Sequence, residues 1–187
     1  MHSKAHLTAV AFFIGTIALS AGNIAIAAKG HSHGKANFDV ALDGNTVKVI
    51  GDIPLEAVVG FERVPSNEAD TTKVKAAAVL LRNADKLFTF SEGANCKSQQ
   101  TELSSAAING ALLGAPAKAA VSSTPADSHI DIDAVWTFQC EKPEALKGMA
   151  VNLFDDFKGL KVIQVKVAGG KRQVGGRLTA SSRKVAW

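Results

Sequence analysis

Apolar and polar side chains alternate along several segments of the chain, which is typical of β-strands with one buried face. The clearest case is residues 128–140, SHIDIDAVWTFQC, where every second residue from Ile130 to Cys140 is apolar. A hairpin is predicted near the start, with Asn37 to Leu42 and Thr46 to Ile53 as strands around the turn Asp43-Gly44-Asn45. Further strands are predicted at 96–103, 149–153, 161–167, 172–178 and 183–187, with a hairpin turn at Gly169-Gly170.

Helical spacing predicts the longest helix between Glu68 and Asn83, where Val74, Ala77 and Leu81 fall on one face. Shorter helical segments are expected at 55–61, near residue 87, at 142–147 and at 154–157. Residues 106–127 are rich in Ala, Gly, Ser and Pro, so we expect a loop or a weakly ordered insertion. Because strands outnumber helices and most connections resemble hairpins, the predicted fold class is α+β, a mainly antiparallel sheet with helices on one face.

The N-terminus departs from this pattern and indicates where the protein works. It has a basic start, an apolar run from Val10 to Leu19 and an A-x-A site at Ala25-Ile26-Ala27, which together describe a secretory signal peptide. The run is shorter than the ~20 apolar residues that a membrane span needs. We therefore expect a cleaved signal peptide at residues 1–27, or cleavage one residue later, after Ala28. The expected product is a single periplasmic domain, 28–187, with a flexible N-terminal leader and no membrane span.

Charge and cysteine content narrow the function further. The formal net charge of the 187-residue chain is +4, and removing Lys4 with the signal lowers it to +3. The basic residues are scattered and no aromatic-rich basic stripe is present, so we expect no nucleic-acid partner. Cys96 and Cys140 both remain after cleavage, and two cysteines in an exported chain usually join. The predicted disulfide would close a loop of 43 intervening residues, worth about 4 kcal/mol in the chain-entropy model.

Candidate metal ligands cluster in two places. His129, Asp131 and Asp133 alternate on one predicted strand face, with successive side chains ~6.5–7 Å apart. Imidazole and carboxylate groups suit zinc, but three side chains along one strand do not converge on a single ion. His31 and His33, in the polar leader, are candidates for the additional ligands. The alternatives are a solvated strand face, which such a pattern more often is, and an ordinary leader without ligands.

The sequence also bears on two other chemistries. Cleavage after Ala28 would leave Lys29-Gly30-His31 as a new terminus, a square-planar nitrogen set that suits Cu(II) or Ni(II). Enzyme motifs are weak: G-x-S-x-G, H-E-x-x-H and P-loop patterns are absent, and Ser181-x-x-Lys184 has no companion motif. We therefore expect no enzymatic activity. Adjacent Glu62 and Arg63 are interpreted as a local ion pair.

Motifs in a fixed order along about 150 residues resemble the ZrgA-like family of periplasmic zinc-uptake proteins, long described as a domain of unknown function. These motifs are His33-Gly34, Asp43-Gly44-Asn45, Val59-Gly60-Phe61-Glu62, Leu81-Arg82-Asn83 ahead of Leu87-Phe88, Cys96, His129-x-Asp131-Ile132, Trp136-Thr137-Phe138-x-Cys140, Phe154-x-x-Phe157-x-Gly159-Leu160 and Gln173 to Leu178. The resemblance implies a periplasmic protein that binds Zn²⁺ and assists its import, with a zinc-import component as a partner.

Two departures from the family pattern matter. The histidine- and acid-rich insert that family members often carry before the His-x-Asp strand is replaced here by a segment without histidine. The family's histidine after Gly-Phe-Glu is replaced by Arg63. A high-capacity zinc store is therefore not expected, and the predicted zinc ligands are His31, His33, His129 and Asp131, with Asp133 in reserve. The second hypothesis is a periplasmic interaction or scaffold module that has kept the fold and lost tight metal binding; an undetected hydrolase is a distant third.

Overall fold

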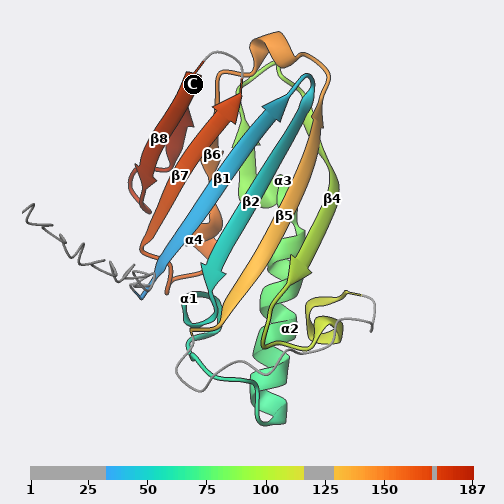
Figure 1. Cartoon of the computed structure of the whole chain (residues 1–187), viewed down its shortest axis with the longest axis vertical. Helices are drawn as coiled ribbons and strands as arrows, with labels where there is room; N and C mark the ends of the chain where they lie inside the picture. The colour runs from blue at the N-terminus through green and yellow to red at the C-terminus, as the bar shows by residue number, and fades with distance from the viewer. Residues whose placement is uncertain (1–32, 116–128, 170–171) are drawn as a thin grey trace, which may run out of the picture. The chain divides into compact units, whose positions relative to one another are not determined.

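The computed structural model describes residues 33–115, 129–169 and 172–187 (Figure 1). The predicted signal peptide, the leader histidine His31 and the alternative terminal motif Lys29-Gly30-His31 lie outside the described residues. Gly170, in the predicted hairpin turn, and residues 116–128 also lie outside them.

Six strands form the larger sheet, in the order β4-β5-β2-β1-β7-β8 (Figure 1). They are β1 (Lys35–Asp43), β2 (Thr46–Pro54), β4 (Cys96–Ser104), β5 (Asp131–Cys140), β7 (Val162–Gly169) and β8 (Arg172–Leu178). Neighbouring strands are antiparallel except β1 and β7, which run parallel. The predicted hairpin is confirmed as β1–β2, in which Asp43 pairs with Thr46 across the turn.

One face of this sheet is buried and the other is open. Figure 1 shows helices α2 (Glu68–Arg82), α3 (Ala84–Leu87) and α4 (Leu153–Asp156) behind the larger sheet, and α1 (Leu55–Val59) at the end of β2. A smaller sheet, β3-β6-β9, consists of Phe88–Phe90, Gly148–Val151 and Lys184–Ala186. The predicted α+β class, a mainly antiparallel sheet with helices on one face, is confirmed.

The alternating apolar residues of the strands form the core between these layers. Trp136 on β5 is fully buried, and its ring centre lies 5.0 Å from that of Phe88 and 5.7 Å from that of Phe38. Its Nε1–H donates a hydrogen bond of 2.7 Å to the Leu81 carbonyl oxygen. Because Leu81 lies near the end of α2, this bond joins the centre of the sheet to the longest helix.

The helices largely follow the sequence pattern. The expected helix at 68–83 is confirmed as α2, and the Asn67 side chain caps it by accepting a hydrogen bond of 2.9 Å from the Asp70 N–H. The helix expected at 55–61 ends earlier, at Val59, because Gly60 adopts a left-handed φ of 83°. Two short 3₁₀ turns, Gly110–Leu113 and Pro143–Ala145, occupy connections between strands.

The expectation of weak order was wrong for residues 106–115. Ile108 and Leu113 are buried in the core, and the Arg82 guanidinium fixes this segment to the end of α2. It donates hydrogen bonds of 2.6 and 3.0 Å to the Leu113 carbonyl oxygen and one of 3.0 Å to that of Thr101. Isolated apolar residues among alanines and glycines carry no period, so the sequence does not signal this packing.

The predicted disulfide between Cys96 and Cys140 is present. The two cysteines are register partners on β4 and β5, so the bond fixes the alignment of these strands at one end of the larger sheet. Such a bond agrees with an exported protein in an oxidising compartment. Within the described residues, no helix is long and apolar enough to cross a membrane.

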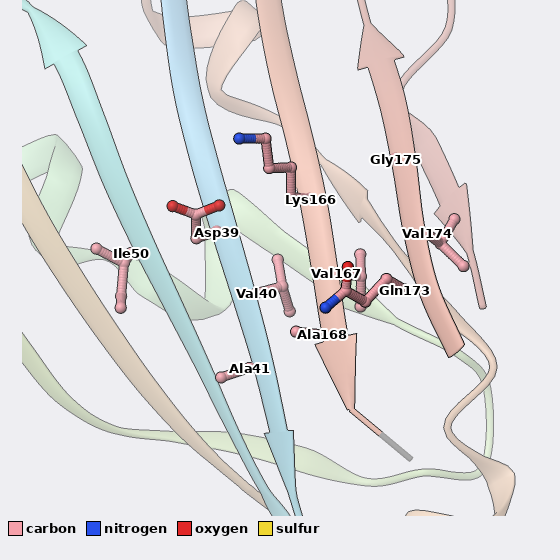
Figure 2. A pocket seen from close by; sticks show the side chains of 10 residues that line it. All are labelled: Asp39, Val40, Ala41, Ile50, Lys166, Val167, Ala168, Gln173, Val174 and Gly175. Carbon is pink, nitrogen blue, oxygen red and sulfur yellow. The ribbon is translucent and has the colours of Figure 1, made fainter. Parts of the chain in front are cut away.

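The open face of the larger sheet carries a shallow hollow of about 400 Å³ over β1, β2, β7 and β8 (Figure 2). Its lining includes Ile50, which is 44% exposed, and the register partners Asp39 and Lys166. The predicted zinc ligands among the described residues do not line it.

Candidate metal site at one end of the larger sheet

Three segments that are far apart in the sequence meet at the end of the sheet opposite the disulfide. The antiparallel register pairs Pro54, the last residue of β2, with Asp131, the first residue of β5. The Leu55 N–H continues this alignment by donating a hydrogen bond of 2.8 Å to the Ile130 carbonyl oxygen. The start of β1 lies beside the end of β2, as Figure 1 shows. The residues just outside these strand ends are therefore neighbours.

His129 and Glu62 form the central contact of this region. The His129 Nδ1–H donates a hydrogen bond to Glu62 Oε1, and the two groups also form an ion pair when the imidazole is protonated. Their side chains are 40% and 26% exposed. The pKa of His129 is raised above its usual value, first by the hydrogen bond to Glu62, then by the charge of that carboxylate, with smaller contributions from Asp131 and Glu56.

His33 approaches the same carboxylate from the start of β1. Its Nδ1 atom lies 3.3 Å from Glu56 Oε1 and 3.9 Å from Glu62 Oε2. The ring centres of His33 and His129 are 6.3 Å apart, with the ring planes nearly perpendicular at 79°. Glu62 thus lies between two imidazoles that are 96 residues apart in the sequence.

The backbone next to His33 is held firmly. The Gly34 N–H donates a hydrogen bond of 2.7 Å to Glu56 Oε1, and the Gly34 carbonyl accepts one of 2.7 Å from the Lys161 N–H. Gly34 has a φ of +70°, and a Cβ atom there would lie 2.6 Å from the Gly159 carbonyl oxygen. Only glycine fits this conformation and this space. Gly34 therefore fixes the backbone position from which the His33 side chain extends.

The predicted acidic ligands lie to one side of this group. Asp131 and Asp133 line a hollow of about 160 Å³ together with His129, Asp52 and Ser105. Asp133 and Asp52 are register partners on adjacent strands. The pKa of Asp133 is raised, first by burial and then by the nearby charge of Asp52. His129 therefore borders both the paired glutamates and the aspartates, while the position of His31 lies outside the described residues.

Sequence reasoning missed the two glutamates. Glu62 belongs to the family-like motif Val59-Gly60-Phe61-Glu62. The interpretation of Glu62 and Arg63 as a local ion pair was wrong, because Arg63 pairs with Asp70 and Glu62 pairs with the two histidines. Glu56 follows the end of a predicted strand, and no spacing linked it to His33. The only available signal was position: both glutamates flank the strand ends that the hairpin brings together.

The Nδ1 atoms of both imidazoles face glutamate carboxylates, through a hydrogen bond for His129 and at 3.3 Å for His33. Histidines that bind metals commonly donate their other ring N–H to a carboxylate, as His129 does here. As they stand, no three His, Cys, Asp or Glu side chains in the described part of the chain are arranged to hold a metal ion.

Residues 30–187 match the family described as ZrgA family zinc uptake protein. The chain belongs to this family. Membership relates the protein to zinc uptake, in agreement with the resemblance found in its motifs. No curated protein matches the chain. The family match includes His33, His129 and both glutamates, so the whole candidate site lies within the matched part of the chain.

Proposed function

We propose that the protein is a non-enzymatic, periplasmic zinc-binding accessory protein that assists zinc import. The observation that carries the proposal is the convergence of His33 and His129 on Glu62 in a member of a zinc-uptake family. Zinc is the cargo in this role, and the residues proposed to hold it are the two histidines with Glu62 and Glu56. His31, Asp131 and Asp133 are proposed as further donors around the same group.

The distances support a fit after a small movement. With Zn–N bonds of ~2.0–2.1 Å, two imidazoles on one tetrahedral zinc ion have ring centres about 5 Å apart. The separation of 6.3 Å between His33 and His129 is about an ångström larger. The His33 side chain is 73% exposed, so it has room to rotate. Zinc would either displace the proton that His129 shares with Glu62, or leave that hydrogen bond in place, in which case Glu62 would be an outer partner that orients His129.

Export supports the same role. The disulfide is typical of oxidising compartments, and the proposed signal peptide would deliver the chain to the periplasm. A zinc-import component in that compartment is the proposed partner that receives the ion.

Calorimetric titration of the exported protein with Zn²⁺ tests the proposal. The wild-type protein should bind one zinc ion, and His33→Gln and His129→Gln should each weaken binding by at least tenfold. Glu62→Gln should cost 10–100-fold, the usual loss for a carboxylate that orients a ligand histidine. Asp43→Asn, at the far end of the β1–β2 hairpin, is the matched control and should bind like the wild type.

Two further variants define the ligand set. Asp131→Asn and Asp133→Asn report whether the aspartates beside His129 take part. Unchanged zinc affinity in both His33→Gln and His129→Gln would refute the proposed zinc site. An absence of binding in the wild type would favour the second hypothesis, a scaffold module without tight metal binding, in which case cross-linking in the periplasm should recover a protein partner.

A further inference from the structure

The loop that carries Glu62 is anchored by the residues directly before and after it. Gly60 ends α1, and its N–H donates a hydrogen bond of 2.9 Å to the Glu56 carbonyl oxygen. Phe61 packs against the core, and the Arg63 guanidinium carbon lies 4.8 Å from the centre of its ring. Arg63, the residue directly after Glu62, then reaches the first turn of α2. The chain on both sides of Glu62 is therefore fixed.

Asp70 is the anchor on α2. It is the one buried charged residue in the described part of the chain, with 5% exposure. Its carboxylate accepts two hydrogen bonds from Arg63: one from Nη2 to Oδ1 at 3.0 Å, and a second from Nη1 to Oδ2. It also accepts bonds from the Ser66 N–H at 3.1 Å and from the Ser66 hydroxyl at 3.2 Å. The bonds from Arg63 and Ser66 lower the pKa of Asp70 to about 2.

This network determines that Arg63 pairs with Asp70 and not with Glu62. Arg63 is adjacent to Glu62 in the sequence, so without Asp70 its guanidinium would be released to compete with the histidines for that carboxylate. A planar guanidinium held in two parallel bonds has little freedom to turn toward another acid. The charge of Glu62 consequently remains directed to His33 and His129.

We propose that Asp70 is a positioning residue for the zinc site: by holding Arg63, it fixes the loop and keeps the arginine away from Glu62. The inference rests on the proposed function for its consequence in zinc affinity, but the placement of Glu62 against His129 exists without metal. Loss of Asp70 would have two effects, a looser loop and a competing cation beside Glu62.

Zinc titration of four variants separates these effects. Asp70→Asn should weaken zinc binding about tenfold, as expected for an outer partner of a metal site. Arg63→Gln should weaken it less, because it loosens the loop without releasing a cation. The double variant Asp70→Asn/Arg63→Gln should resemble Arg63→Gln alone. The control is Asp156→Asn, which breaks the 2.8 Å ion pair between Lys86 and Asp156, away from the loop.

Dependence on Glu62 distinguishes positioning from a general loss of stability. In a Glu62→Gln background, Asp70→Asn should cause no further loss of zinc affinity, whereas general destabilisation would add to it. Equal zinc affinities for the wild type, Asp70→Asn and Arg63→Gln would overturn the proposal, as would a full additional loss in the Glu62→Gln background.

A readout without metal keeps the proposal testable if zinc does not bind. The pKa of His129, followed by NMR of its ring protons, should be raised in the wild type and in Asp156→Asn. In Asp70→Asn it should fall toward its ordinary value, because Glu62 no longer faces the ring steadily. A raised pKa retained in Asp70→Asn would refute the positioning role, while absent zinc binding with a lowered pKa would refute only the proposed function.

Discussion

The two ends of β5 are held to their neighbours by different kinds of bond. At Cys140 the strand is covalently joined to β4. At the other end, the segments around Asp131 meet through hydrogen bonds and ion pairs between partly exposed side chains. The disulfide at the Cys140 end thus restricts the unfolded chain, whereas the Asp131 end presents titratable side chains to solvent. The covalent cross-link and the proposed ion-binding groups therefore lie at opposite ends of one strand.

Removing the covalent end should have the largest effect on stability. Replacing Cys96 and Cys140 together with serine should lower the free energy of unfolding by about 4 kcal/mol, because the unfolded chain regains the freedom of the closed loop. Urea denaturation measures this loss. Zinc affinity of the folded variant should stay unchanged, since the disulfide is at the far end of the sheet. A large loss of zinc affinity in the folded variant would show that the two ends are coupled.

A change at Gly34 should disturb the polar end. Gly34→Ala should cost ~3 kcal/mol, because the left-handed backbone disfavours alanine and the new Cβ would press on the Gly159 carbonyl oxygen. Zinc affinity should fall with it, since His33 is displaced. Gly44→Ala is the matched control: its φ is also positive, at 57°, but no atom lies within 4 Å of the new Cβ. That variant should lose ~1 kcal/mol and keep its zinc affinity. Equal losses in both variants would show that the contact with Gly159 is unimportant.

The contribution of Asp70 to the free energy of unfolding should be lost at low pH. The pKa of Asp70 is about 2 in the folded protein, below its usual ~3.9, so its stabilisation is present above pH ~4 and is lost as the pH falls toward 2. Asp70→Asn should therefore flatten the dependence of unfolding free energy on pH in this range. Asp155→Asn is a useful comparison, because Arg183 also lowers the pKa of Asp155 but that side chain is 52% exposed. It should flatten the profile less, and the reverse order would contradict the assignment.

The smallest expected effect is the response of His129 near neutral pH. Its pKa is raised, so the stabilisation from its charged form is complete below pH ~6.5 and is lost as the pH rises through the raised value. Urea denaturation between pH 5.5 and 8.5 should show this decline in the wild type. His129→Gln and Glu62→Gln should both remove it. A decline that persists in both variants would assign the titration to another group.

The strands were predictable because alternation is a local property. From Ile132 to Cys140, the predicted inward residues are all buried, and the hairpin turn was marked by Asp43-Gly44-Asn45. In the smaller sheet, β6 and β9 were predicted at 149–153 and 183–187, but β3, with only three residues, was too short to leave a pattern.

The candidate site was predictable only in part. His33 and His129 could be proposed because histidine is rare in this chain, with five in total. Glu62 could not be assigned, because its nearest charged neighbour in sequence is Arg63, which instead pairs with Asp70, a residue on another element. Partners chosen in three dimensions leave no mark in the spacing of a sequence.

The order of the larger sheet constrains when the chain can finish folding. β1, the first strand, lies between β2, which follows it directly, and β7, which comes more than a hundred residues later. Until residues 162–169 have been synthesised, β1 has no partner strand on the edge opposite β2. For the same reason, the Lys161 and Val162 N–H groups cannot yet donate to the Gly34 carbonyl oxygen. His33 therefore acquires its final place only when the last quarter of the polypeptide arrives, so a nascent chain would be unable to assemble the histidine pair early.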